Sequence, residues 1–157
     1  MPVDEFEAYG VSEMADDRVH GFLSSQQVGV LGIATDGAPS MRPLSYWYDG
    51  ESTLYFQFLG TAGGRKATLS TQSEAARFLV YRAETRFNWR SVLLTGTIDE
   101  VPADEREAVE AAVEFERPDA LAAASDAEEH RLFAFHIDDW TGLEHLGLPP
   151  EFEDDPE

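Results

Sequence analysis

Two Asp-Gly pairs constrain the fold of this chain more than any other sequence feature. Asp36-Gly37 separates the apolar segment 28–34 from the segment 40–48, and Asp49-Gly50 separates the latter from the segment 53–59. Each segment has the length of a strand, and Asp-Gly pairs are favoured in tight turns between antiparallel strands. The pattern therefore predicts three consecutive antiparallel strands.

Three further segments that are rich in β-branched and aromatic residues predict additional strands, at 75–82, 88–98 and 131–137. Gly96, inside the second of them, predicts a β-bulge or a close approach of two backbones. Turns are expected after the third, at Asp138-Asp139 and at Thr141-Gly142.

Two amphipathic segments predict helices beside these strands. The first begins at Ser12 and runs to about Gln26, and the second covers 103–115. A short helix is also expected over 67–72. Six mostly antiparallel strands favour a small closed barrel, because closure leaves no strand edge unpaired. The expected fold class is therefore mainly β (α+β), with a six-stranded antiparallel barrel and flanking helices.

The chain is expected to form one domain over residues 1–150, followed by a disordered acidic tail over 151–157. The absence of cysteine excludes disulfides, thiolate metal sites and a cysteine nucleophile. No apolar run approaches the length of a membrane span, and the N-terminus is acidic rather than signal-like. We therefore expect a cytoplasmic protein without a membrane partner.

The charge is strongly negative and unevenly distributed. The chain has 31 acidic and 11 basic residues, for a net charge of −20. Such a surface repels nucleic-acid phosphates, so nucleic acid is not an expected partner. Residues 28–99 carry six acidic and seven basic residues, whereas residues 100–157 carry nineteen and three. The core and any anionic ligand are expected in the neutral middle.

A surface rich in acids and poor in lysine, with Lys66 as the single lysine, predicts a halophilic host. Concentrated salt screens the self-repulsion that otherwise opposes compaction. We predict that the free energy of unfolding is larger in concentrated salt than in dilute buffer. Chemical unfolding at the two salt concentrations measures this, and equal stability in both would contradict the hypothesis.

The turn Gly63-Gly64-Arg65-Lys66, at the end of the stretch from Leu54, is one candidate site. Glycines let backbone N–H groups approach an anion, and the two cations supply countercharge. An ordinary turn with two solvated cations explains the same residues. The spacing is not that of a Walker loop, and no dinucleotide-binding glycine motif is present.

Three aromatic segments, at 42–48, 55–58 and 87–91, form a second candidate site. Flat apolar faces with a few polar groups suit a planar heteroaromatic ligand. An aromatic core combined with a dimer interface is an equal alternative. The four histidines lack the spacing of a metal site, and no serine has the setting of a catalytic nucleophile, so no bound metal is expected.

Taken together, these segments resemble the pyridoxamine 5′-phosphate oxidase-like proteins, the FMN-binding split-barrel superfamily. The resemblance covers about residues 15–100 and rests on the order of the following elements: an N-terminal helix, the strand 28–34, Arg42-Pro43-Leu44, the strand 54–58, Gly64-Arg65-Lys66, and Trp89 to Leu94 followed by Gly96. It implies a split barrel that binds FMN, with the cofactor at the interface of a homodimer.

The resemblance also implies which residues bind the cofactor. Arg65 and Lys66 would hold the phosphate, and Ser91 would reach the flavin from the neighbouring subunit. Thr61 would replace a hydroxyl residue that the family often has where this chain has Phe58. The complete set of expected cofactor-binding residues is Arg42, Pro43, Leu44, Ser45, Gln57, Phe58, Thr61, Arg65, Lys66, Trp89 and Ser91.

The C-terminal region departs from the pyridoxamine-phosphate oxidases proper, which carry a tryptophan and an arginine at the substrate site. Here Trp140 is present, but no arginine follows Arg131. The resemblance therefore implies an FMN-dependent reductase or oxidase of an unidentified small molecule. The alternatives are a deazaflavin-dependent reductase and a flavin- or haem-binding carrier or sensor without turnover. No catalytic residue is assigned.

Overall fold

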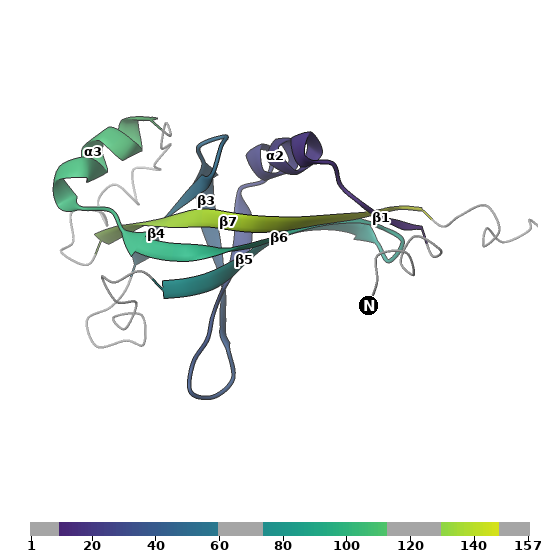
Figure 1. The fold of residues 1–157 in the computed structure, drawn as a ribbon, viewed down its shortest axis with the longest axis horizontal. Coiled ribbons are helices and arrows are strands. Elements are labelled where there is room, and N and C mark those ends of the chain that lie inside the picture. The colour runs from purple at the N-terminus through teal and green to yellow at the C-terminus, as the bar shows by residue number, and fades with distance from the viewer. Residues whose placement is uncertain (1–9, 60–73, 113–129, 148–157) are drawn as a thin grey trace, which may run out of the picture.

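The structure is a computed structural model that describes residues 10–59, 74–112 and 130–147. Its strands are β1 (Val11–Glu13), β2 (Val28–Ile33), β3 (Ser40–Tyr48), β4 (Thr53–Leu59), β5 (Glu74–Thr85), β6 (Asn88–Glu100) and β7 (His130–Leu146). They form one antiparallel sheet in the order β1, β7, β4, β3, β2, β5 and β6, and β6 also pairs with β7 (Figure 1). Strands β2 to β7 thus close into the predicted six-stranded barrel, which is confirmed.

Strand β7 is the longest strand and joins the two ends of the sheet. One of its edges pairs with β6 from Phe133 to Leu146. Its other edge pairs first with β4, over residues 130–136, and then with β1, over residues 143–145. The interior of the barrel is filled by four phenylalanines that are fully buried, Phe56, Phe78, Phe133 and Phe135.

Two helices flank the barrel. Helix α2 (Asp16–Ser25) lies over one face and buries Val19, Phe22 and Leu23 in the main core (Figure 1). Helix α3 (Ala103–Ala112) begins shortly after β6, and its Val109 packs against a second, smaller cluster around Leu132. No helix in the described part of the chain has the length and hydropathy needed to cross a membrane.

The first helix does not begin at Ser12 as predicted. Residues Val11–Glu13 form β1, and the backbone N–H of Met14 donates to the carbonyl of Gly142 at 2.8 Å. The helix begins at Asp16, after Ala15 as the N-cap residue. Ser12 is therefore a strand residue opposite Glu144, because the long β7 offers a free edge beyond the end of β4.

The predicted turns after residue 137 are also wrong, because β7 continues to Leu146. Its register with β6 shifts between Thr95 and Gly96, which face Asp139 and Ile137, so that Asp138 is the extra residue of a β-bulge. The predicted irregularity at Gly96 is confirmed. The second turn signal, Gly142, is instead a position where α2 packs closely: a Cβ there would lie 2.7 Å from Val19 Cγ2.

The two Asp-Gly pairs lie in the predicted connections, which are longer than two residues. Asp36-Gly37 lies between Ile33 and Ser40, where the Thr35 hydroxyl donates to the carbonyl of Ala38 at 2.6 Å. In the second connection, a carboxylate oxygen of Asp49 accepts hydrogen bonds from three successive backbone N–H groups, and Gly50 has a φ of 90°. Hydrogen bonds between side chain and backbone thus organise both turns.

The close approach at Gly96 makes a sharp stability prediction. A Cβ on this residue would lie 2.0 Å from the carbonyl oxygen of His136 and 2.9 Å from Phe135 Cε1. Because the obstacle includes backbone, we expect Gly96→Ala to lower the free energy of unfolding by about 2–4 kcal/mol. Urea unfolding measures the effect.

The matched control is Gly32→Ala, also in a strand, where the nearest atom to the new Cβ would be the Arg77 carbonyl oxygen at an ordinary 3.7 Å. This variant should be as stable as the parent or slightly more so, since alanine restricts the unfolded chain. If both variants lost the same stability, the argument from close approach would be wrong.

Candidate functional site

The barrel opens between β3 and β4. Strand β3 pairs with β2 from Ser40 to Ser45, but it pairs with β4 only over Tyr46–Tyr48. The register would next place Ser45 opposite Gln57, and the ladder stops there. Among the described residues, the edge of β3 from Ser40 to Ser45 therefore has no strand partner on this side. We call this opening the split.

The backbone direction shows which groups of β3 face the split. The N–H of Tyr46 donates to the Gln27 carbonyl at 2.9 Å, on the side of β2. Because successive residues of a strand point their backbone groups to opposite sides, Ser45 and Pro43 face the split. Ser45 therefore directs a backbone N–H and a C=O into the split. Pro43 has no N–H, but its backbone faces the split, so the ladder with β2 loses no hydrogen-bond donor.

The four predicted residues of β3 do not share one face. The register places Ser45 opposite Val28 and Pro43 opposite Val30, on the outer face of the barrel. Leu44 lies opposite Gly29 and packs against the main core. Arg42 is exposed and lies opposite the buried Leu31. Two of the four side chains, those of Pro43 and Ser45, therefore lie on the outer face beside the split.

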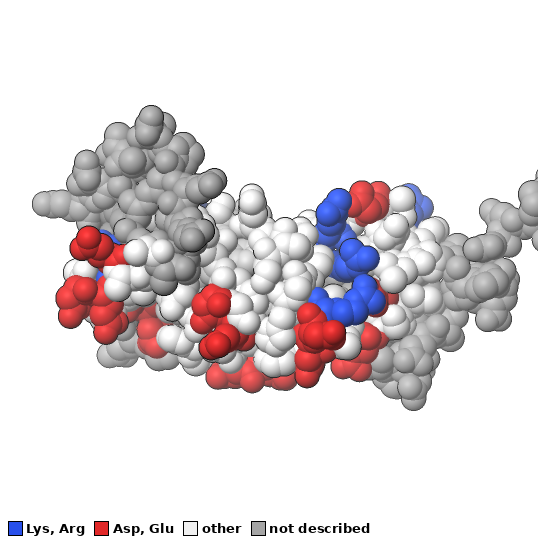
Figure 2. All heavy atoms as spheres, turned by 90° about the horizontal axis from the view of Figure 1, so that it is seen from above, with Lys and Arg blue, Asp and Glu red and all other residues white. Residues whose placement is uncertain are grey.

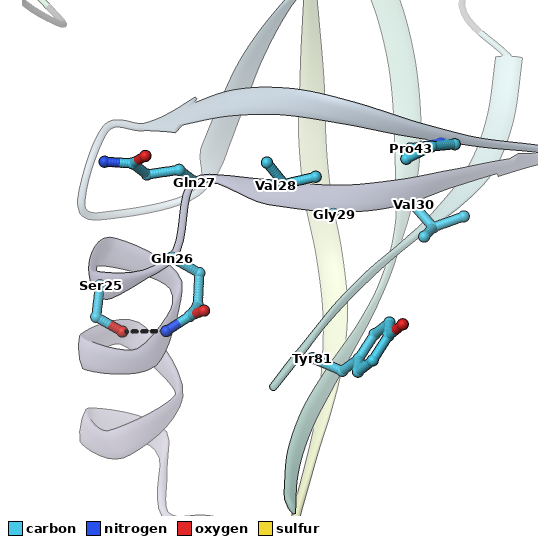
Figure 3. Close-up of a pocket in the computed structure, with 8 residues that line it drawn as sticks. All are labelled: Ser25, Gln26, Gln27, Val28, Gly29, Val30, Pro43 and Tyr81. Carbon is cyan, nitrogen blue, oxygen red and sulfur yellow. Dashed lines mark hydrogen bonds between the residues drawn. The ribbon is translucent and has the colours of Figure 1, made fainter. Parts of the chain in front are cut away.

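A groove of about 500 Å³ adjoins this face (Figure 3). Its lining comes from the end of α2, from β2, and from single residues of β3 and β5, and consists of Ser25, Gln26, Gln27, Val28, Gly29, Val30, Pro43 and Tyr81. Only Pro43 among these was predicted. Val28 and Tyr81 are 53% and 56% exposed, although both side chains are largely apolar. No local sequence signal marks them, because Val28 begins β2, Tyr81 lies within β5, and only the pairing of these two strands brings both to this face.

Gly29 contributes backbone alone to the groove, for a steric reason. A Cβ there would lie 2.3 Å from Phe78 Cε1, so the phenylalanine ring occupies that space from inside the barrel. In Figure 3, Tyr81 and Pro43 project from strands on opposite sides of β2. The groove is thus an open surface around β2 that combines apolar side chains with the polar residues at the end of α2.

The predicted residues of β6 lie on the same outer face. Ser91 is opposite Tyr81 of β5, and Trp89 is opposite Ala83. The Trp89 ring contacts His145 nearly perpendicularly, with ring centroids 5.9 Å apart. The structure therefore brings Ser91 beside a groove residue and places Trp89 further along the same strand.

Gln57 stands at the other side of the split. Its side-chain nitrogen Nε2 is buried and has no hydrogen-bond partner among the described residues. Leaving a buried amide donor unpaired costs about 1–3 kcal/mol, so this atom marks a place where an acceptor is expected. The side chain of Phe58 is outside what the structure describes, as are Thr61, Arg65 and Lys66.

A buried hydroxyl connects α2 with β3 next to the split. The Tyr46 hydroxyl donates to the Leu23 carbonyl in α2 at 2.7 Å, and burial raises the pKa of this hydroxyl above its ordinary value. The phenol therefore stays neutral and donates this hydrogen bond at neutral pH. It ties α2 to β3 at the residue after Ser45.

No group of three or more histidine and carboxylate side chains in the described ranges is arranged to hold a metal ion. What the site can do instead is bind a flat ligand. The groove supplies apolar surface, the free edge of β3 supplies backbone donors and acceptors, and Gln57 supplies an unpaired donor.

Comparison with known proteins shows the family and the fold of the chain. The family model described as pyridoxamine 5′-phosphate oxidase matches residues 15–144, which confirms the resemblance drawn from the sequence. No curated protein matches the chain.

Several solved structures share the fold. An FAD-binding protein from Mesorhizobium loti is 23% identical, with 85% of this chain and 96% of that chain covered and a TM-score of 0.62. The FAD-binding protein from Mycobacterium smegmatis is 15% identical, with 87% and 100% covered and a TM-score of 0.67. The FAD- and haem-binding protein of the same organism is 19% identical, with 94% and 77% covered and a TM-score of 0.65.

Proposed function

Because the chain belongs to the pyridoxamine 5′-phosphate oxidase family, we propose that it binds a flavin, FMN, at the split and serves as an oxidoreductase for a small molecule. The observation that carries the proposal is the pair of groups at the split. Within the described ranges, Ser45 presents backbone N–H and C=O groups on an unpaired edge, and Gln57 presents a buried donor without a partner.

These groups fit the chemistry of a flavin. The edge of an isoalloxazine ring alternates carbonyl oxygens with an N–H group, so it needs both donors and acceptors in one plane. A strand edge supplies such an alternation, and the apolar residues Val28, Val30 and Pro43 suit the ring face. The groove volume of about 500 Å³ also falls within the usual range for small-molecule sites.

The protein residues have binding and positioning roles in this proposal. A bound flavin supplies the transfer of hydride or single electrons. Arg65 and Lys66 neutralise its phosphate, as the family resemblance implies, while Ser45 and Gln57 orient the ring. The choice of FMN rests on that resemblance, whereas three solved structures with this fold are described as flavoproteins that bind FAD, one of them together with haem.

The cofactor experiment is the identification of what the purified protein carries. Flavin absorbance, with release of FMN on denaturation and its mass, supports the proposal, and release of FAD corrects the cofactor. A haem Soret band would favour the alternative of a carrier or sensor that binds haem. One solved structure with this fold is described as binding both FAD and haem. Oxidation of reduced nicotinamide or reduced deazaflavin by the flavin-loaded protein distinguishes an enzyme from a carrier that binds flavin without turnover.

Gln57→Leu should separate ligand binding from folding. The Gln57 donor has no partner in the part of the chain that the structure describes, so its removal should leave the free energy of unfolding of the flavin-free protein unchanged or higher. Flavin affinity should fall about tenfold, because a hydrogen bond to the ring is lost. Fluorescence titration with FMN and urea unfolding measure the two quantities. Lower stability with unchanged affinity would make Gln57 a structural residue.

A second pair of variants tests the phosphate contact. Lys66→Ala should weaken FMN binding by about 1.5–3 kcal/mol, through loss of a charge-assisted hydrogen bond. The charge-matched control is Arg86→Ala, because Arg86 is exposed in the turn between β5 and β6. Equal affinity in both variants would remove Lys66 from the site.

We also propose that the protein is a homodimer whose second copy covers the outer face of β2, β5 and β6. The register gathers apolar side chains on this face: Val28, Val30, Leu79, Tyr81, Leu93 and Leu143. A contiguous apolar surface of this kind is uncommon on a monomer. Ser91 and Trp89 lie on the same face, where a partner's cofactor could meet them.

Sedimentation velocity should therefore give the mass of a dimer, and Leu79→Glu should shift it to that of a monomer. Leu79 is only partly buried in one copy, so a charge there should disrupt association more than folding. A circular dichroism spectrum like that of the parent serves as the folding control. A monomeric parent protein would contradict the dimer and leave the flavin proposal untouched.

A further inference from the structure

Two arginines contact one buried carboxylate on the opposite side of the sheet from the groove, and a third arginine lies directly across from one of them. The strand register places Arg82 of β5, Arg90 of β6 and Glu144 of β7 in one row. Arg18 of α2 reaches the same carboxylate, with its NH1 2.7 Å from Glu144 Oε1. We call Arg18, Arg82 and Arg90 the arginine cluster.

The cluster is unusual on a molecule with a net charge of −20. Figure 2 shows the face that carries α2, where most basic side chains gather in one patch and acidic side chains are spread around it. The arginine side chains are 41–61% exposed, so a ligand can reach them from solvent. The cluster thus concentrates accessible positive charge at one place.

The acidic residues at the cluster leave part of its positive charge unpaired. Glu144, with a side chain only 7% exposed, is shared between Arg18 and Arg90, and Glu84 binds Arg82 through Nε at 2.6 Å. Three cations therefore face two anions. The Nε of Arg90 is buried and faces Glu144 Oε2 at 3.6 Å, so the exposed part of this guanidinium group is what a ligand can reach.

The placement of two arginines directly across from each other has an energetic cost. Arg82 and Arg90 are opposite each other on neighbouring strands, where like charges destabilise a sheet. An anion that bridges the two guanidinium groups would remove this repulsion. Arginine suits an oxyanion with several acceptor oxygens, because its planar group donates two parallel hydrogen bonds.

We propose that the arginine cluster binds a phosphate group, as the free ion or as the terminal group of a small molecule. The site is separate from the split. Tyr81 lines the groove, and the next residue, Arg82, points to the other face because side chains alternate along a strand. The proposal stands on these contacts and does not depend on the flavin.

The test is isothermal titration calorimetry of the full-length protein with inorganic phosphate, at an ionic strength held constant with sodium chloride. Saturable binding is expected, and Arg82→Gln should weaken it about tenfold, because one charge-assisted contact is lost. Arg82 is exposed, and its ion pair with Glu84 is also exposed, so this variant should fold. Glycerol 3-phosphate is titrated in parallel. Tighter binding of the ester assigns the phosphate to a small molecule, and tighter binding of the ion assigns it to free phosphate; both support the site.

The matched control is Arg77→Gln, on the same strand as Arg82 but on its outer face. It should bind phosphate as tightly as the parent. Equal weakening in both variants would reduce the effect to general electrostatics and overturn the proposal, as would the absence of saturable binding. Titration in the presence of excess FMN distinguishes the two sites. Unchanged phosphate affinity supports a separate site, and competition would assign the arginines to the flavin instead.

Discussion

The ladder between β6 and β7 is the interaction on which the rest of the structure depends. It runs from Phe133 to Leu146 on β7 and joins the two ends of the sheet. Because it is continuous except for one bulge, it closes the barrel on one side and surrounds the phenylalanine core. Gly96 makes this possible, since any side chain there would meet the backbone of His136.

Strong closure on one side allows an opening on the other. β3 is held by β2 along most of its length and needs β4 only over Tyr46–Tyr48. The Tyr46 hydroxyl and α2 fix the point where the two strands part. An unpaired strand edge is normally a liability, so a free edge beside the unpaired donor of Gln57 indicates a surface that another group completes. The flavin proposal identifies that group.

The sequence predicted the order of the strands well, because Asp-Gly pairs and apolar periodicity are local signals. It failed where distant segments decide the structure. Ser12 has the properties of a helix cap, but β7 recruits it into a strand. Thr141-Gly142 has the properties of a turn, but Gly142 is small because α2 packs against it.

The candidate site was predictable only in part, for a similar reason. Pro43 and Ser45 are in a motif and could be named, but which of their neighbours share their face depends on register. Val28 and Tyr81 come from neighbouring strands that are far apart in the sequence, and no local pattern connects them with Pro43. The role of Gln57 depends on a missing partner, which only a three-dimensional structure can show. The turn with Arg65 and Lys66 stays a prediction.

Alternation along β5 and β6 lets one sheet serve two different chemistries. Tyr81 and Ser91 face outward with the apolar residues, and their neighbours Arg82 and Arg90 face the opposite side with Glu144. A shift of register by one residue would exchange the two sets and bury arginines against an apolar surface. The ion pairs that Arg18 and Arg90 make with Glu144 therefore help to fix the register that places Ser91 beside the groove. In this way the charged face contributes to the geometry of the apolar face.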